Sequence, residues 1–264
     1  MMKITVIGAG NMGGAIVRGF TKGSLVEAAD ITCTAYSQQT LDKLLLFNEN
    51  IRVSLNNKEA VLGADIVILA VKPWKLEAVI SEINENLDYD NQIIISVAGG
   101  ISFEQLIPYF SKSQKGTPSL FRVIPNTAIA VMTGMTFISS NNTSRTQEEL
   151  VLALFSELGK ALAIEENQME AATALASCGI AFALRYIRAA TEGGVELGMY
   201  PDQAREIVAQ TVKGAAELLL VNNAHPEVEI DKVTTAGGIT IRGLNEMEAH
   251  GFTSAIIKGL KASK

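Results

Sequence analysis

Short apolar runs rich in β-branched residues alternate with segments of helical periodicity through the first 164 residues. Such alternation is typical of βαβ units, in which a parallel sheet carries helices on both faces. The pattern therefore predicts an α/β, doubly wound parallel sheet. Strands are predicted at residues 3–7, 31–35, 51–53, 65–70, 92–97 and 120–124, with weaker strands at 135–138 and 160–164. Helices are predicted between them at residues 11–22, 40–48, 74–85 and 146–158.

The pattern changes near residue 165, where β-branched runs give way to Ala, Leu, Glu and Arg at helical spacing. Residues 168–197 predict one helix of about 30 residues, which would be about 45 Å long. This segment is largely apolar on more than one face, as is typical of a helix buried by other helices. A second helix is predicted to begin at Pro201, because proline suits the first helical turn. The chain is therefore divided into an α/β domain, residues 1–164, and an all-α domain, residues 165–264.

Composition and charge narrow the class of protein. The net charge is −6 and no long run of Lys or Arg occurs, which argues against partners such as nucleic acid or a membrane surface. The sequence contains no stretch of about 18 or more uninterrupted apolar residues, so a membrane span is not expected. Cys33 and Cys178 form no CxxC or Cys/His cluster, so neither a disulfide scaffold nor a metal site is expected. A reducing cytoplasm is the predicted location.

The glycine-rich segment GAGNMG at residues 8–13 follows the first predicted strand directly and opens a helix. Each glycine has a distinct steric task in this Rossmann-type pattern. Gly8 makes a tight turn, Gly10 lets the backbone approach a pyrophosphate, and Gly13 lets helix and strand pack closely. The pyrophosphate would meet the unpaired N–H groups at the helix start. The position after a strand makes a dinucleotide site a strong prediction.

The end of the second predicted strand bears on which dinucleotide is used. NAD-specific sites usually place Asp or Glu there to bind the ribose 2′-hydroxyl. Residues 34–40 read TAYSQQT and contain no carboxylate. Ser37 and Thr40 could donate to a 2′-phosphate, although no Arg is present. We therefore expect NADP as the preferred cofactor, with NAD as the alternative.

Three further motifs follow predicted strands: AVKP at residues 70–73, SVAGGI at 96–101 and RVIPNT at 122–127. Doubly wound sheets bind ligands at this carboxyl edge. Near the C-terminus, residues 231–240 read DKVTTAGGIT. Together with residues 8–13, these segments resemble the pyrroline-5-carboxylate reductase family. The resemblance runs nearly end to end, and the C-terminal segment is its most specific part.

The resemblance implies reduction of 1-pyrroline-5-carboxylate to L-proline by hydride transfer from NADPH or NADH, the last step of proline biosynthesis. It also implies that the helical domain forms an intertwined homodimer, or a higher oligomer built from dimers, with the substrate near the dimer interface. The cofactor carries the hydride, and the protein supplies orientation and electrostatics. A hydroxyl donor and a cradle for the substrate carboxylate would then suffice.

The resemblance also implies roles for individual residues. The pyrophosphate site would comprise Gly8, Gly10, Asn11, Met12 and Gly13, with Ser37 and Asn57 near the adenosine ribose and Ala70, Lys72 and Pro73 near the nicotinamide ribose. The substrate carboxylate would be held at a helix start by Thr235, Gly237, Gly238 and Ile239. Thr240, the candidate catalytic residue, would point its hydroxyl at the ring nitrogen.

Simpler structural interpretations remain open for several of these residues. Lys72 and Pro73 could only end a strand, and Pro125-Asn126 could only mark a turn. Gly237-Gly238 could be a turn that precedes Thr240 as a helix N-cap. Trp74 is expected to be a packing residue. The two histidines, His225 and His250, are expected to lie at the surface or cap helices rather than act in catalysis.

Departures from the family pattern keep other functions open. Tyr36 stands where bacterial members often carry Arg, and Ala236 stands where Pro is usual. One alternative is another cyclic imine reductase or a β-hydroxyacid-type dehydrogenase. The latter relies on a catalytic Lys in the long helix, whereas residues 168–197 contain Arg185 and Arg188 but no Lys. A third possibility, from outside enzymology, is a catalytically silent dinucleotide-binding sensor.

Overall fold

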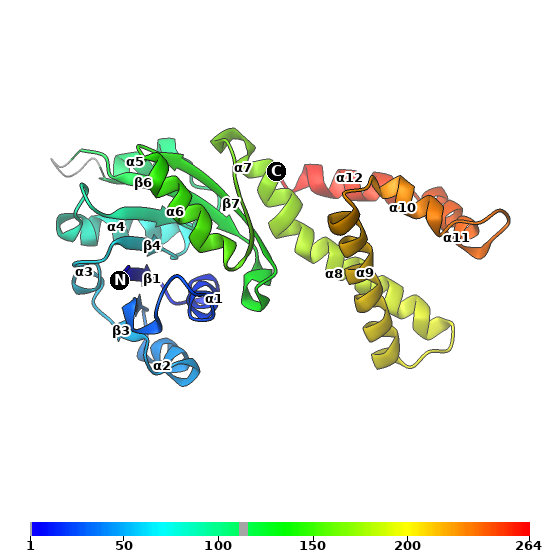
Figure 1. Cartoon of the computed structure of the whole chain (residues 1–264), viewed down its shortest axis with the longest axis horizontal. Coiled ribbons are helices and arrows are strands. Elements are labelled where there is room, and N and C mark those ends of the chain that lie inside the picture. The colour runs from blue at the N-terminus through cyan, green and yellow to red at the C-terminus, as the bar shows by residue number, and fades with distance from the viewer. Residues whose placement is uncertain (1, 111–115) are drawn as a thin grey trace. The chain divides into compact units, whose positions relative to one another are not determined.

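The computed structural model describes residues 2–110 and 116–264. The chain divides into two compact units, Met1–Ser177 and Cys178–Lys264 (Figure 1). The first unit contains one sheet, and the second unit consists of helices and the turns between them. None of the helices within the described residues has the length and apolarity needed to cross a membrane.

The first unit is built on an eight-stranded sheet in the order β3-β2-β1-β4-β5-β6-β7-β8. Successive strands from β3 to β6 run parallel, as the doubly wound prediction requires. Because the chain winds outward from β1 on one side and from β4 on the other, the order reverses between these two strands. The strand bounds are β1 (Ile4–Ile7), β2 (Ile31–Thr34), β3 (Arg52–Ser54), β4 (Ile66–Leu69), β5 (Ile93–Ser96), β6 (Ser119–Pro125), β7 (Gly134–Asn141) and β8 (Gly159–Ala163).

All the predicted strands form, and the sheet is parallel at every pairing except one. β7 runs antiparallel to β6, and β8 runs parallel to β7. The connection from β6 to β7, residues 126–133, contains only a 3-10 turn. A parallel crossover needs a dozen or more residues, so this short link forces the antiparallel pairing.

Helices cover both faces of this sheet and create two cores. Along β4 the side chains alternate, so that Ile66 and Ile68 belong to one core and Val67 and Leu69 to the other. The first core includes Phe20 of α1 and apolar residues of α6, and the second includes apolar residues of α4 and α5. The bounds are α1 (Asn11–Phe20), α2 (Gln38–Phe47), α3 (Asn57–Ala60), α4 (Leu76–Ile83), α5 (Phe103–Phe110) and α6 (Arg145–Ser156); α3 and α5 add to the predicted helices.

The helical path that follows β8 is not one regular α-helix. It comprises η5 (Glu166–Gln168), α7 (Met169–Ala172), a π-helical segment at Thr173–Cys178 and α8 (Gly179–Glu196). The predicted single α-helix over residues 168–197 is corrected by this π-helical interruption, and such segments often lie at functional sites.

The start of this path packs against the sheet of the first unit. Met169 and Ala172 are buried with Ile124 and Phe137, which is why the compact first unit extends to Ser177. The assignment of residues 1–164 and 165–264 as two functional domains stays a prediction.

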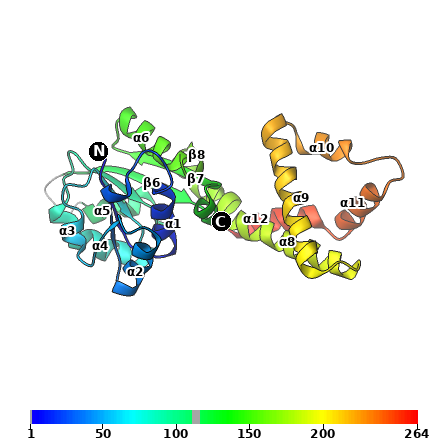
Figure 2. The same ribbon diagram turned by 60° about the horizontal axis from the view of Figure 1, so that its bottom comes forward.

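The second unit buries very little of its own apolar surface. Ala204 is its one buried residue among residues 178–264, all of which the structure describes. α8 and α9 pack against each other, and Figure 2 shows them crossing. α9 begins at Pro201, as predicted, and the bounds are α9 (Pro201–Asn222), α10 (Pro226–Lys232), α11 (Ile239–Ala249) and α12 (Phe252–Ala262). Large apolar side chains remain exposed on these helices, among them Leu184, Leu218, Leu220, Val221, Phe252 and Ile257.

Candidate functional site

A cleft of about 1210 Å³ opens in the first unit at the carboxyl ends of β1, β2 and β4. This is the point where the strand order reverses, and open α/β sheets bind their ligands there. The structure brings most of the expected cofactor residues together around this cleft, although Ser37 and Gly13 do not line it. The expected residues that line it are Gly8, Gly10, Asn11, Met12, Asn57, Ala70, Lys72 and Pro73.

The three glycines of the first motif meet different steric conditions. Gly8 has a φ of +97°, and a Cβ on it would lie 2.8 Å from the carbonyl oxygen of Ala70. A Cβ on Gly13 would lie 2.2 Å from the carbonyl oxygen of Gly8, so only glycine allows α1 to approach the turn this closely. A Cβ on Gly10 would meet no heavy atom within 4 Å. The predicted turn and close packing are therefore present, and the backbone of Gly10 faces open space.

α1 begins in a way that leaves its first backbone donors available to a ligand. Gly10 is the N-cap residue and provides no side-chain cap. The first N–H groups of an α-helix have no partner within the helix, and they carry the positive end of its dipole. The cleft therefore presents a helix start of the kind that binds phosphate groups.

One wall of the cleft is organised by a chain of hydrogen bonds after β2. The Thr34 hydroxyl donates to Asn57 Oδ1 at 2.6 Å, and Asn57 Nδ2 donates to Glu82 Oε2 at 3.1 Å. Ser37 is the N-cap residue of α2, and its Oγ lies 3.1 Å from Thr40 Oγ1. Thr40 lines the cleft although Ser37 does not.

The sequence interpretation missed three charged residues that line this cleft: Arg18, Lys75 and Glu82. Lys75 and Glu82 lie seven positions apart, with Val79 between them, which is the spacing of one helical face. That spacing was the available signal for Lys75 and Glu82. Arg18 follows Asn11 of α1 at the same seven-residue spacing, with Ala15 between them, so the same signal was available for it.

The segment after β4 supports both interpretations of Lys72 and Pro73. β4 ends at Leu69, and Lys72 precedes Pro73 at the first position of the short helix η2 (Pro73–Lys75). Both residues also line the cleft. The expectation that Trp74 packs in the interior is wrong, because its side chain is 76% exposed. The Lys72 ammonium lies 6.0 Å from the centre of the Trp74 ring.

Asn126, at the end of β6, has a structural role that agrees with the turn interpretation. It is buried and is the N-cap residue of a 3-10 helix. Its Oδ1 accepts from the backbone N–H groups of Ala128 and Met135, at 3.1 and 3.3 Å, and its Nδ2 donates to the Ala176 carbonyl at 3.3 Å. Asn126 therefore holds the π-helical segment against the end of β6.

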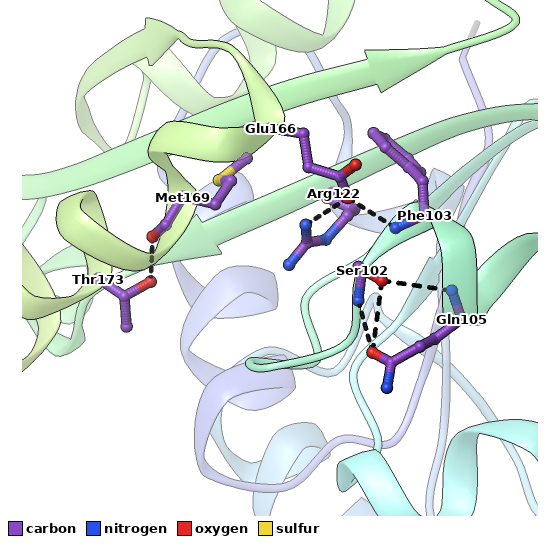
Figure 3. Close-up of polar contacts among 7 residues, drawn as sticks. All are labelled: Ser102, Phe103, Gln105, Arg122, Glu166, Met169 and Thr173. Carbon is purple, nitrogen blue, oxygen red and sulfur yellow. Dashed lines mark hydrogen bonds and ion pairs between the residues drawn. The ribbon is translucent and has the colours of Figure 1, made fainter. Parts of the chain in front are cut away.

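Arg122 of the same motif forms an ion pair that fixes the start of the helical path (Figure 3). Glu166 Oε1 accepts from Arg122 Nη1 at 2.5 Å and from the backbone N–H of Phe103 at 2.6 Å. The Arg122 side chain is 8% exposed, and its Nε is buried without a hydrogen-bond partner among the described residues. One carboxylate thus joins η5, β6 and the first turn of α5.

The C-terminal motif forms a turn and a helix start in the second unit. Gly237 has a φ of +68°, and the N–H of Gly238 donates to the Thr235 carbonyl at 3.0 Å. Gly238 is the N-cap residue of α11, so the interpretation of Thr240 as N-cap is wrong. Thr240 lies in the first turn of α11 and is exposed, as is Ile239. The segment combines a free helix start with an exposed hydroxyl.

The remaining polar candidates have ordinary structural roles. His225 is the N-cap residue of α10, where its Nδ1 accepts from the N–H of Glu227, and His250 ends α11. The capping prediction for both histidines is thereby confirmed. Burial raises the pKa of the Cys33 thiol to about 12, and a protonated, buried thiol is unreactive.

The fold and the cleft define a class: a dinucleotide-binding protein with a doubly wound sheet and a separate helical unit. Two family models match the chain. The model described as NADP oxidoreductase, coenzyme F420-dependent, matches residues 3–100. The model described as pyrroline-5-carboxylate reductase dimerisation matches residues 166–264.

Proteins named pyrroline-5-carboxylate reductase match nearly the whole chain. Pyrroline-5-carboxylate reductase 1 of Dictyostelium discoideum is 40% identical over 98% of this chain, which spans 48%, or about half, of that relative's length. The pyrroline-5-carboxylate reductase of Methanosarcina acetivorans is 36% identical over 99% of this chain and 97% of the relative. A crystal structure of the Plasmodium falciparum pyrroline carboxylate reductase with NADP bound has a TM-score of 0.88 and 25% identity, covering 99% of this chain and 95% of that one. The chain therefore belongs to the pyrroline-5-carboxylate reductase family.

The contact at Gly13 gives a first test of the cleft. We expect Gly13→Ala to weaken NADP⁺ binding at least about tenfold and to lower the melting temperature, because the new Cβ meets backbone rather than a movable side chain. Gly14→Ala is the matched control, since its Cβ would lie 3.4 Å from the Arg18 guanidinium and alanine favours helix. Calorimetric titration and thermal unfolding measure both effects. Equal behaviour of the two variants would contradict the assigned packing.

The Arg122–Glu166 pair gives a test of stability. We expect Glu166→Ala to lower the free energy of unfolding by about 2 kcal/mol, because it leaves a buried guanidinium without its charge partner. Glu149→Ala removes an exposed pair with Arg145 and should cost about 0.5 kcal/mol or less. Urea unfolding followed by the fluorescence of Trp74, the single tryptophan, reports on the first unit. A loss no larger than that of the control would show that the buried pair contributes nothing.

Proposed function

We propose that this chain reduces 1-pyrroline-5-carboxylate to L-proline, the last step of proline biosynthesis, with NADPH or NADH as hydride donor. It is thus an NAD(P)-dependent oxidoreductase acting on the C=N bond of a cyclic imine. The observation that carries the proposal is the cleft at the strand reversal, where glycine geometry and a free helix start suit a pyrophosphate. The choice of substrate is inferred from the membership of the chain in the pyrroline-5-carboxylate reductase family.

The residues around the cleft fit a dinucleotide. Gly8, Gly10, Asn11, Met12 and Gly13 surround the pyrophosphate position: the open space at Gly10 admits it, and Gly8 and Gly13 set the approach of α1. Asn57, held by Thr34, lies toward the adenosine ribose together with Ser37. Ala70, Lys72 and Pro73 border the nicotinamide ribose. When bound, the cofactor supplies the hydride, and these residues only bind and orient it.

In this proposal the C-terminal turn supplies the protein groups that bind the substrate. The helix start at Gly237, Gly238 and Ile239, shaped by Thr235, holds the substrate carboxylate through backbone N–H groups. The exposed Thr240 hydroxyl donates a hydrogen bond to the ring nitrogen. The imine accepts hydride in its form already protonated at nitrogen, so hydride addition at the neighbouring carbon gives the neutral amine. The Thr240 hydroxyl donates to the nitrogen lone pair that this step creates.

NADPH is the preferred donor in this proposal. Residues 34–40 carry no carboxylate to receive a ribose 2′-hydroxyl or repel a 2′-phosphate. The cleft lining contains three basic side chains, Arg18, Lys72 and Lys75, against one acidic side chain, Glu82. This balance favours the dinucleotide with the larger negative charge.

The helical unit forms a homodimer in this proposal, and any larger assembly is built from such dimers. A unit that buries only Ala204 among residues 178–264 cannot be stable on hydrophobic grounds alone. A groove of about 490 Å³ offers mixed surface to a second copy: its apolar lining is Leu184, Ile187, Val195 and Pro201, and its polar lining is Arg188, Thr191, Glu192 and Arg205. Both cysteines are free, which is compatible with the cytoplasm as the location.

Turnover tests the proposed activity. Oxidation of NADPH and of NADH, followed by absorbance, should be rapid with 1-pyrroline-5-carboxylate and faster with NADPH. We expect Thr240→Ala to lower kcat about a hundredfold, because the hydroxyl donor is lost. Thr240→Ser keeps the hydroxyl and should retain most of the activity. Binding of NADPH without turnover by the unaltered chain would instead favour a dinucleotide sensor.

The mass of the chain in solution tests the dimer. Light scattering should give twice the 28.2 kDa of one chain, or a larger even multiple of it. Leu184→Glu should weaken the dimer, since it places a charge on an apolar surface that the partner covers. Leu62→Glu, at a leucine of the first unit with the same exposure of 59%, is the matched control. A monomer for the unaltered chain at micromolar concentration would overturn the dimer.

A further inference from the structure

We propose that Lys75 is the residue that recognises the 2′-phosphate of NADPH, and that it does so from the segment after β4 rather than from the loop after β2. The inference rests on the proposed function, because it assumes that the cleft binds a dinucleotide. It adds a specificity-determining residue that no sequence motif pointed to.

Lys75 and Tyr36 meet across the edge of the cleft. Tyr36 lies two residues beyond the end of β2, and its side chain is 97% exposed. Lys75 ends η2 and is the N-cap residue of α4. Its ammonium lies 5.0 Å from the centre of the Tyr36 ring, within the range of a cation–π contact. The ring therefore holds a positive charge beside the segment that follows β2.

This part of the cleft offers hydrogen-bond donors. Lys75 and Thr40 both line the cleft, and the Ser37 and Thr40 hydroxyls lie 3.1 Å apart next to Tyr36. An ammonium with nearby hydroxyls suits a phosphate group, to which each can donate. A ribose 2′-hydroxyl would instead need an acceptor such as a carboxylate. The chemistry at Lys75 thus distinguishes the two dinucleotides.

The acidic residue of the cleft does not neutralise this charge. Glu82 lies seven residues after Lys75, a separation of about 10 Å along a helix. The Glu82 carboxylate accepts a hydrogen bond from Asn57 Nδ2 at 3.1 Å. In the described part of the chain, no carboxylate lies within 4.0 Å of the Lys75 ammonium. Lys75 therefore keeps its charge available to a ligand.

The other cations that line the cleft, Lys72 and Arg18, have different neighbours. The Lys72 ammonium faces the Trp74 ring at 6.0 Å. The Arg18 guanidinium folds along α1, where it would lie 3.4 Å from a Cβ on Gly14. Among the cleft residues, Lys75 is thus the cation placed over Tyr36, which directly precedes the Ser37 and Thr40 segment.

The test compares two adenosine fragments that differ only in the group Lys75 would contact. Adenosine 2′,5′-bisphosphate and adenosine 5′-monophosphate are titrated calorimetrically into the full-length protein. Lys75→Gln should weaken binding of the bisphosphate about tenfold, since an ionic hydrogen bond is lost, and leave the monophosphate within about twofold. Lys75→Arg should restore most of the affinity for the bisphosphate. Lys160→Gln, at an exposed lysine of β8 outside the cleft, is the matched control.

The outcomes separate this inference from the proposed function. A selective loss for the bisphosphate in Lys75→Gln, together with a lower preference for NADPH over NADH in kcat/KM, supports it. Unchanged binding of both fragments, or an equal loss of both, overturns the role of Lys75 while the dinucleotide cleft stands. If neither fragment binds the unaltered protein, the dinucleotide site itself fails, and the role of Lys75 fails with it.

Discussion

The contact between the first turn of α1 and the loop after β1 is the constraint on which the cleft depends. A Cβ on Gly13 would lie 2.2 Å from the carbonyl oxygen of Gly8, which is too close for any side chain. The helix and the loop therefore contact each other through their backbones. This approach aims the uncapped start of α1 into the space where the strand order reverses. The proposed pyrophosphate site is therefore set by sheet topology and glycine placement.

The two units satisfy the requirement for a hydrophobic core in different ways. The first unit has two cores, because β4 and its neighbours bury both faces under helices. The second unit has helices without a core, since Ala204 alone is buried there. The family's matched region in this half is a dimerisation model, and the exposed leucines explain why such a unit would need a second copy.

Much of the first unit could be predicted from local pattern. β-branched runs predicted the strands, and the motif at residues 8–13 predicted where the cleft lies. The errors have physical causes. The antiparallel pairing of β7 follows from the length of a connection. The π-helical segment at Thr173–Cys178, whose Ala176 carbonyl accepts from Asn126, was not predicted by the local pattern. Trp74 was expected to be a packing residue, yet it lies in the short helix η2 with its side chain exposed.

The sequence by itself determined the order of elements, the glycine turn and the family, because these depend on residues that are close along the chain or on fixed spacing. Only the tertiary structure decided which charges share the cleft. Lys75 meets Tyr36 across the sheet edge, and Glu166 reaches Arg122 from 44 residues away. Such pairs carry no periodic signal, since their proximity arises when strand pairing brings separate loops to one edge. The sequence specified the chemical groups, and the fold decided which of them meet.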